Sequence, residues 1–129
     1  MNTYTIERKV LIEHLDDLNH VNNVYYLSWV QDAAKAHWKS LIANQNFEFH
    51  AWVVRSHYIE YKKAAELGDK ILITTYVKNS KAYLSERIVE VSLKKSGQLL
   101  ARCTTQWCYI NKSSGKKELI PKHIIDLLA

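Results

Sequence analysis

The chain has 129 residues, of which 47% are hydrophobic and 24% charged, a balance that is typical of one folded domain over residues 1–129 and excludes an intrinsically disordered chain. No segment approaches the ~18 apolar residues of a membrane-spanning helix, and the first residues lack a signal-peptide core, so we expect a cytoplasmic protein with no membrane span. The net charge of +5 is spread along the chain, which is too modest to predict a nucleic-acid partner.

The first part of the chain predicts a strand, a polar loop and a long helix. Residues 3–13 contain alternating β-forming side chains without glycine or proline, as in a strand. From Asn22 or Asn23 to Leu41, apolar residues recur at steps of three and four, which predicts one helix with a broad apolar stripe. The loop between them, HLDDLNHVNN, is rich in Asp, Asn and His.

The rest of the chain predicts four strands and a short terminal helix. Residues 51–64, 70–77, 82–95 and 98–112 are rich in β-branched and aromatic side chains, and turn residues such as Asn79-Ser80 separate them. Short turns imply an antiparallel meander, and Pro121 is suited to the first turn of a helix. We therefore expect an α+β fold in which a curved antiparallel sheet of about five strands wraps around the long helix.

The two cysteines, Cys103 and Cys108, lie five residues apart in the last predicted strand. Their side chains should therefore point to opposite faces of the sheet. We expect two core thiols rather than a disulfide or a pair of metal ligands.

Three sequence patterns resemble one known family. Asp16 to Leu27 resembles the D-x-D-x-x-G-H-V-N-N-x-x-Y-L signature of hotdog-fold acyl-CoA thioesterases, the 4-hydroxybenzoyl-CoA thioesterase-like group with its YbgC-like members. Tyr61 with Gly68-Asp69, and Gly115 with Pro121, resemble two further elements of that family. The chain departs from these patterns at three positions, where His14 replaces an Asp, Asn19 a Gly and Ala64 a Pro.

This resemblance implies a hotdog fold and the hydrolysis of an acyl-CoA thioester to a carboxylic acid and free CoA. It also implies a homodimer, or a tetramer of two dimers, with the thioester bound at the subunit interface. No cofactor is expected, because CoA is part of the substrate, and no metal is expected. Two other functions remain open, namely an acyl-carrier-protein thioesterase and a non-catalytic module that binds acyl thioesters.

The polar loop and the helix start contain the groups that thioester hydrolysis needs. Asp16 is the predicted base or nucleophile, His20 a proton shuttle or a partner that orients Asp16, and Asn23 an amide that positions water or the carbonyl. If Asn22 caps the helix, the backbone N–H groups of Asn23 and Val24 lie where they can stabilise an oxyanion.

These residue types also have simpler interpretations. Asp16 and the asparagines are common in any strand-to-helix turn, where their side chains accept hydrogen bonds from the backbone. In the resembled enzymes, basic residues before the fourth strand contact the CoA nucleotide. The resemblance therefore implies that Lys78, Ser80 and Lys81 bind the CoA phosphates, but these residues also fit the solvated tip of a hairpin. His14 and His20 do not form a recognised metal-binding pattern with Asp16.

Overall fold

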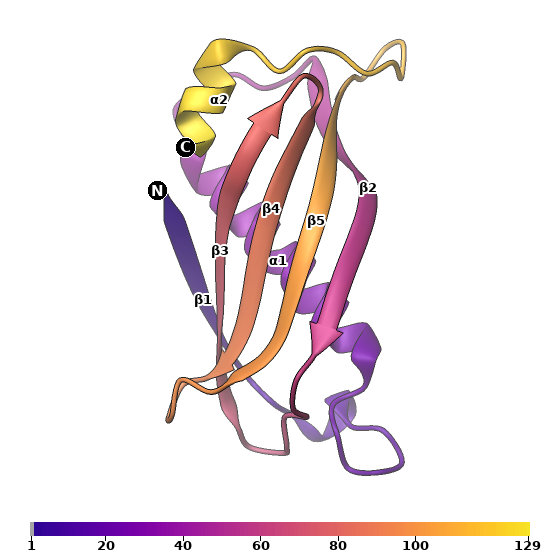
Figure 1. The fold of residues 1–129 in the computed structure, drawn as a ribbon, viewed down its shortest axis with the longest axis vertical. Helices are drawn as coiled ribbons and strands as arrows, with labels where there is room; N and C mark the ends of the chain where they lie inside the picture. The colour runs from indigo at the N-terminus through magenta and orange to yellow at the C-terminus, as the bar shows by residue number, and fades with distance from the viewer. Residues whose placement is uncertain (1) are drawn as a thin grey trace.

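One long helix lies against a curved, five-stranded antiparallel sheet in the computed structural model, which describes residues 2–129 (Figure 1). This is the predicted architecture. In chain order the elements are β1 (Thr3–Lys9), a 3-10 turn η1 (Ile12–His14), α1 (Asn23–Leu41), β2 (His50–Tyr61), β3 (Lys70–Lys81), β4 (Leu84–Leu93), β5 (Leu99–Asn111) and α2 (Lys122–Leu128).

The sheet order is β1-β3-β4-β5-β2, so only β3, β4 and β5 form the predicted meander. β2 pairs with β5 from His50 opposite Asn111 to Tyr61 opposite Ala101, with one register irregularity between Val54 and Ser56. The expectation that β2 leads by a turn into a neighbouring strand is wrong. The connection over residues 62–69 instead crosses the end of the sheet. Ala65 in this connection is buried, and its carbonyl accepts a hydrogen bond from the N–H of Val21 at the start of the helix.

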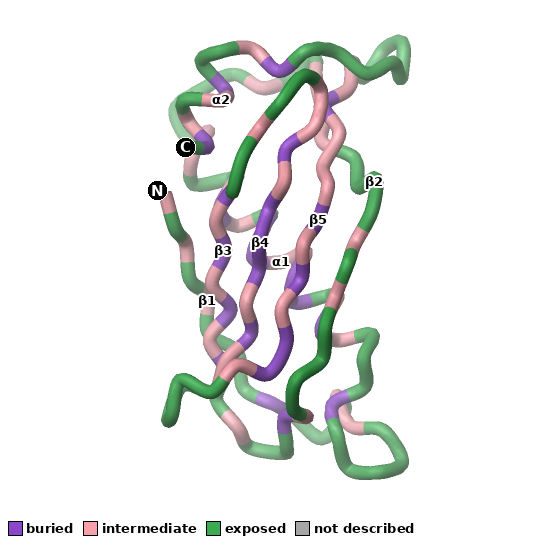
Figure 2. The backbone as a smooth tube through the Cα atoms, viewed as in Figure 1, coloured by how far each residue is buried: buried purple, intermediate pink, exposed green. Residues whose placement is uncertain are grey.

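The core lies between α1 and the inner face of the sheet, because the apolar stripe of the helix needs cover. Figure 2 shows buried residues concentrated on β3, β4 and β5, whereas β2 is exposed over most of its length. The buried members of the main cluster include Tyr26, Trp29, Val30 and Ala33 from α1 and Ile71, Ile73, Val89, Val91 and Leu100 from the sheet.

Two predicted boundaries are wrong. The first strand ends at Lys9, and η1 follows within the range predicted as strand. Asn79 and Ser80 do not form a turn, because β3 continues to Lys81 with an irregular register after Val77. The two-residue turn is at Ala82 and Tyr83, where Ala82 takes a left-handed φ of 57°.

Both cysteines are free thiols, as expected, but only Cys103 is fully buried, whereas Cys108 is half-buried. Within residues 2–129, neither helix is long and apolar enough to cross a membrane.

Candidate active site

The carboxylate of Asp16 organises the loop before α1. Its Oδ1 atom accepts hydrogen bonds from the backbone N–H groups of Leu18 at 2.8 Å and His20 at 3.1 Å. The Asp16 N–H donates to the carbonyl of His20 at 2.7 Å, which closes the loop into a compact turn. Among the described residues no hydrogen bond engages Oδ2, so one carboxylate oxygen is available for chemistry while the other holds the loop.

The N-terminus of α1 is capped by Asn22, as predicted. The side-chain Oδ1 of Asn22 accepts a hydrogen bond from the N–H of Val24 at 3.2 Å. The N–H of Val24 therefore already has a partner, whereas no hydrogen bond to the N–H of Asn23 occurs within residues 2–129. Of the two predicted oxyanion donors, Asn23 is the one that is free to bind a ligand.

A cavity of about 280 Å³ opens at this helix start. It brings together the three residues that the sequence predicts as catalytic, Asp16, His20 and Asn23. All three are exposed in the single chain. The cavity is lined by Asp16, His20, Val21, Asn23, Tyr26, Tyr61, Lys62, Lys63 and Ala64.

The far wall of this cavity comes from the end of β2 and the residues after it, which the site prediction did not include. Tyr26 and Tyr61 pack edge to face with ring centroids 5.4 Å apart, and the Tyr26 hydroxyl accepts a hydrogen bond from the N–H of Ala65 at 3.0 Å. Burial raises the pKa of both phenols, so both stay neutral near pH 7. Lys62 and Lys63 add positive charge to the wall. The family element formed by Tyr61 and Gly68-Asp69 is the sequence feature that could have indicated this wall.

His14 and Asn19, two of the departures from the family signature, both have a structural role in the loop. The Nδ1 atom of His14 accepts a hydrogen bond from the N–H of Leu11 at 2.9 Å. Its ring packs against Tyr25 and Trp29, at centroid distances of 4.7 and 5.3 Å. Asn19 takes a left-handed φ of 60°, a conformation that glycine and asparagine tolerate better than other residues.

Lys78, Ser80 and Lys81 do not approach the Asp16 cavity. They lie at the end of β3 next to α2, at the opposite end of the sheet from the loop that precedes α1 (Figure 1). Lys78 is 3.9 Å from Glu86, and Ser80 shares a hydrogen bond with Ser85 at 3.0 Å. A single chain therefore does not bring this predicted CoA-binding group together with the catalytic group.

Comparisons with known proteins assign the family. Residues 10–128 match the family model described as the thioesterase-like superfamily. The long-chain acyl-CoA thioesterase FadM of Escherichia coli is 31% identical over 100 residues, which cover 72% of each chain.

Solved structures share the fold over nearly the whole chain. A 1,4-dihydroxy-2-naphthoyl-CoA thioesterase from Synechocystis superposes with a TM-score of 0.85 at 22% identity, covering 98% of this chain and 96% of that one. The probable thioesterase YbaW from Escherichia coli has a TM-score of 0.83 at 23% identity, with 96% and 95% covered. The predicted hotdog fold is confirmed, and the chain belongs to the thioesterase-like superfamily.

Proposed function

We propose that this protein hydrolyses acyl-CoA thioesters in the cavity at the start of α1. The observation that carries the proposal is that Asp16, His20 and Asn23 line one cavity at a helix N-terminus. The identity with the acyl-CoA thioesterase FadM supports the same reaction.

The proposed reaction uses the free Oδ2 of Asp16 as a general base. It takes a proton from water, the resulting hydroxide attacks the thioester carbon, and the carbonyl oxygen becomes an oxyanion that the N–H of Asn23 stabilises. The C–S bond then breaks, and the proton passes to the CoA sulfur, directly or through His20. Direct attack by Asp16 to form an anhydride is the alternative covalent route.

We also propose that the site is completed in a homodimer formed along the outer edge of β2. This edge has no strand partner among residues 2–129, and Val53, Val54 and Tyr58 are exposed along it. An unpaired, apolar edge of this length is a template for pairing with another chain. A two-fold axis would set the opposite ends of the two sheets next to each other. The partner subunit's Lys78 and Lys81 would then lie at the same end of the joined sheet as the Asp16 cavity, beyond β5 and β4 of that subunit.

The activity can be tested with Asp16→Asn, because asparagine keeps an oxygen acceptor for the N–H groups of Leu18 and His20. Thioesterase activity, measured by thiol release on a panel of acyl-CoAs of different chain length, should fall by ~10²-fold or more in kcat. Asp17→Asn is the matched control, because Asp17 is exposed and does not line the cavity. Full activity of the Asp16→Asn variant would refute the proposed role of Asp16.

The same assay distinguishes the other two functions. A much higher kcat/KM for acyl carrier protein than for acyl-CoA would assign the carrier protein as the substrate. Binding of acyl-CoA without any thiol release at high enzyme concentration would identify a non-catalytic binding module.

A further inference from the structure

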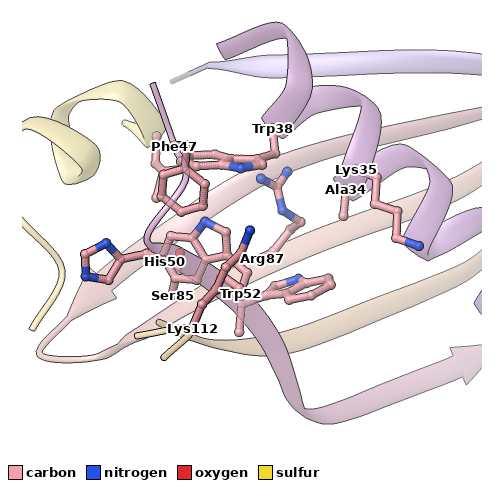
Figure 3. Close-up of a pocket in the computed structure, with 12 residues that line it drawn as sticks. Ala34, Lys35, Trp38, Phe47, His50, Trp52, Ser85, Arg87 and Lys112 are labelled. Atoms are coloured by element: carbon pink, nitrogen blue, oxygen red, sulfur yellow. The ribbon is translucent and has the colours of Figure 1, made fainter. Parts of the chain in front are cut away.

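A second cavity of about 280 Å³ lies between the C-terminal half of α1 and the sheet (Figure 3). It shares no lining residue with the Asp16 cavity, and Ala34 at its wall is ~16 Å along the helix from Asn23 at 1.5 Å per residue. Within one chain the cavity is therefore separate from the Asp16 cavity. It is lined by Ala34, Lys35, Trp38, Phe47, His50, Ala51, Trp52, Ser85, Arg87, Trp107, Lys112 and Leu128.

The unusual member of this lining is Arg87 on β4, a charged residue that is only 5% exposed. Its Nη1 atom donates to the Nδ1 of His37 at 2.8 Å and to the hydroxyl of Thr75 at 3.0 Å. Because Nδ1 of His37 accepts this bond, His37 is neutral, and Nε2 is left to donate to the Asn2 side chain at 3.3 Å.

Arg87 thus has polar neighbours but no negative charge to balance it. None of the ion pairs formed within residues 2–129 includes Arg87. A buried guanidinium without a carboxylate carries a large desolvation cost, since buried charges in proteins are normally paired. The pKa of Arg87 falls from 12.5 to about 10 because of this burial, so it remains positively charged near pH 7.

Besides the unbalanced charge of Arg87, the same cavity has two hydrogen-bond donors that lack an acceptor. The indole nitrogens of Trp52 and Trp107 are buried and have no hydrogen-bond partner in the described part of the chain. Buried indole N–H groups usually find an acceptor. Two neutral donors without an acceptor, from β2 and β5, and one cation without a counter-ion, from β4, therefore border a single cavity.

The remaining walls are apolar, and the rim is positively charged. Trp38 and Phe47 pack edge to face at 4.9 Å, and Figure 3 shows the Arg87 guanidinium extending toward Trp38. Lys35 and Lys112 at the rim are exposed. An inorganic anion would use the donors but leave the aromatic walls uncovered, whereas a neutral apolar molecule would cover the walls but leave the charge unpaired.

We infer that this second cavity binds a small carboxylic acid whose carboxylate pairs with Arg87 and whose apolar or aromatic body packs against Trp38 and Phe47. A water molecule occupies ~30 Å³ in the liquid, so a cavity of about 280 Å³ has room for about nine groups of that size. This volume suits acids of the size of benzoate or octanoate. This inference goes beyond the proposed hydrolysis, because the contacts that carry it involve none of Asp16, His20 and Asn23.

Titration with benzoate and octanoate, followed by calorimetry and by the indole N–H signals in a ¹H–¹⁵N NMR spectrum, tests the inference. The Trp52 and Trp107 signals, assigned with Trp52→Phe and Trp107→Phe, should shift strongly on binding. The Trp29 signal should not shift, because Trp29 does not line this cavity. Benzamide and octanamide, which lack the charge, should bind at least 10-fold more weakly than the acids.

Arg87→Gln should reduce the affinity for each acid to the affinity for its amide. Arg102→Gln is the control, because Arg102 pairs with Glu90 and does not line this cavity, and it should leave the affinity for the acids unchanged. Ala34→Leu fills the cavity without altering the Arg87 contacts and should abolish binding, which keeps the test informative if Arg87→Gln does not fold. Asp16→Asn should bind the acids normally, so the result is independent of the hydrolytic site.

Equal affinities for acid and amide, or shifts of the Trp29 signal alone, would overturn the inference. Normal acid binding by a folded Arg87→Gln or Ala34→Leu variant would overturn it as well, and so would loss of binding in Asp16→Asn.

Discussion

The backbone of Asn19 is left-handed, with a φ of 60°, in the middle of the loop that positions Asp16. The family signature has glycine at this position, and both residues tolerate this conformation. We predict that Asn19→Gly changes the free energy of unfolding by less than ~0.5 kcal/mol, whereas Asn19→Val lowers it by ~1–2 kcal/mol. Urea unfolding measures both, and Asp17→Val at the exposed neighbouring position serves as the control. Equal stability of the Val and Gly variants would contradict this account.

His37 makes stability depend on pH. Burial, together with the nearby charge of Arg87, lowers the pKa of His37 from 6.5 to about 4. Because the folded-state pKa is the lower one, the unfolded state binds more protons, and stability that is fully present above pH 6.5 is lost as the pH falls toward 4.

We predict that this one residue removes ~1–3 kcal/mol of unfolding free energy between pH 7.5 and pH 4.5. His37→Asn, whose amide oxygen can accept from Arg87, should lose correspondingly less stability over the same range. Urea unfolding at several pH values gives the two curves. His123→Asn is the control because His123 is exposed on α2, and its curve should follow the wild-type one. Parallel curves for wild type and His37→Asn would rule out this role.

At the scale of the element, the start of α1 depends on one side chain. Asn22→Ala removes the acceptor for the N–H of Val24 and should lower the free energy of unfolding by ~1 kcal/mol, whereas Asn22→Asp should retain the cap. Asn44→Ala, at an exposed position after the helix, should change it by less than ~0.5 kcal/mol. Thermal and urea unfolding test this, and a fully stable Asn22→Ala variant would mean that the capping bond contributes nothing.

The elements that sequence predicts well are those whose signals are local. The apolar stripe and the Asn22 cap predict α1 correctly because both act within a few residues. The position of β2 at the far edge of the sheet is not local, because it depends on how residues 62–69 pack across the helix start. The β3–β4 turn was misplaced because Asn79 and Ser80 are common turn residues, whereas Ala82 is an unusual residue for a left-handed φ.

At the scale of the whole molecule, the same distinction applies to the two cavities. Asp16, His20 and Asn23 are predictable together because they are close in sequence, in the loop before α1 and at its first residue. The wall from Tyr61 to Ala64 is about forty residues away, and only the fold brings it to that loop. The sequence did not indicate that Arg87 is buried, because an arginine in a strand is ordinarily exposed. Its contacts with His37 on α1 and Thr75 on β3 form only in the folded chain.

The proposed homodimer forms along the exposed edge of β2, so lysine substitutions there should weaken dimer formation most strongly. We predict that the double variant Val53→Lys/Tyr58→Lys is monomeric, because like charges would face each other across a two-fold axis that pairs two copies of this strand. Sedimentation equilibrium measures the assembly state, and thiol release measures activity.

Loss of the dimer should also lower kcat by at least ~10-fold, because the Asp16 cavity would stay open to water instead of being closed by a second subunit. Leu119→Lys changes an exposed apolar residue outside β2 and should leave both assembly and kcat unchanged. A double variant that remains dimeric would show that the dimer interface does not lie along β2. A monomer with full activity would instead show that one chain holds the complete site, and the partner subunit's lysines would then have no part in binding CoA.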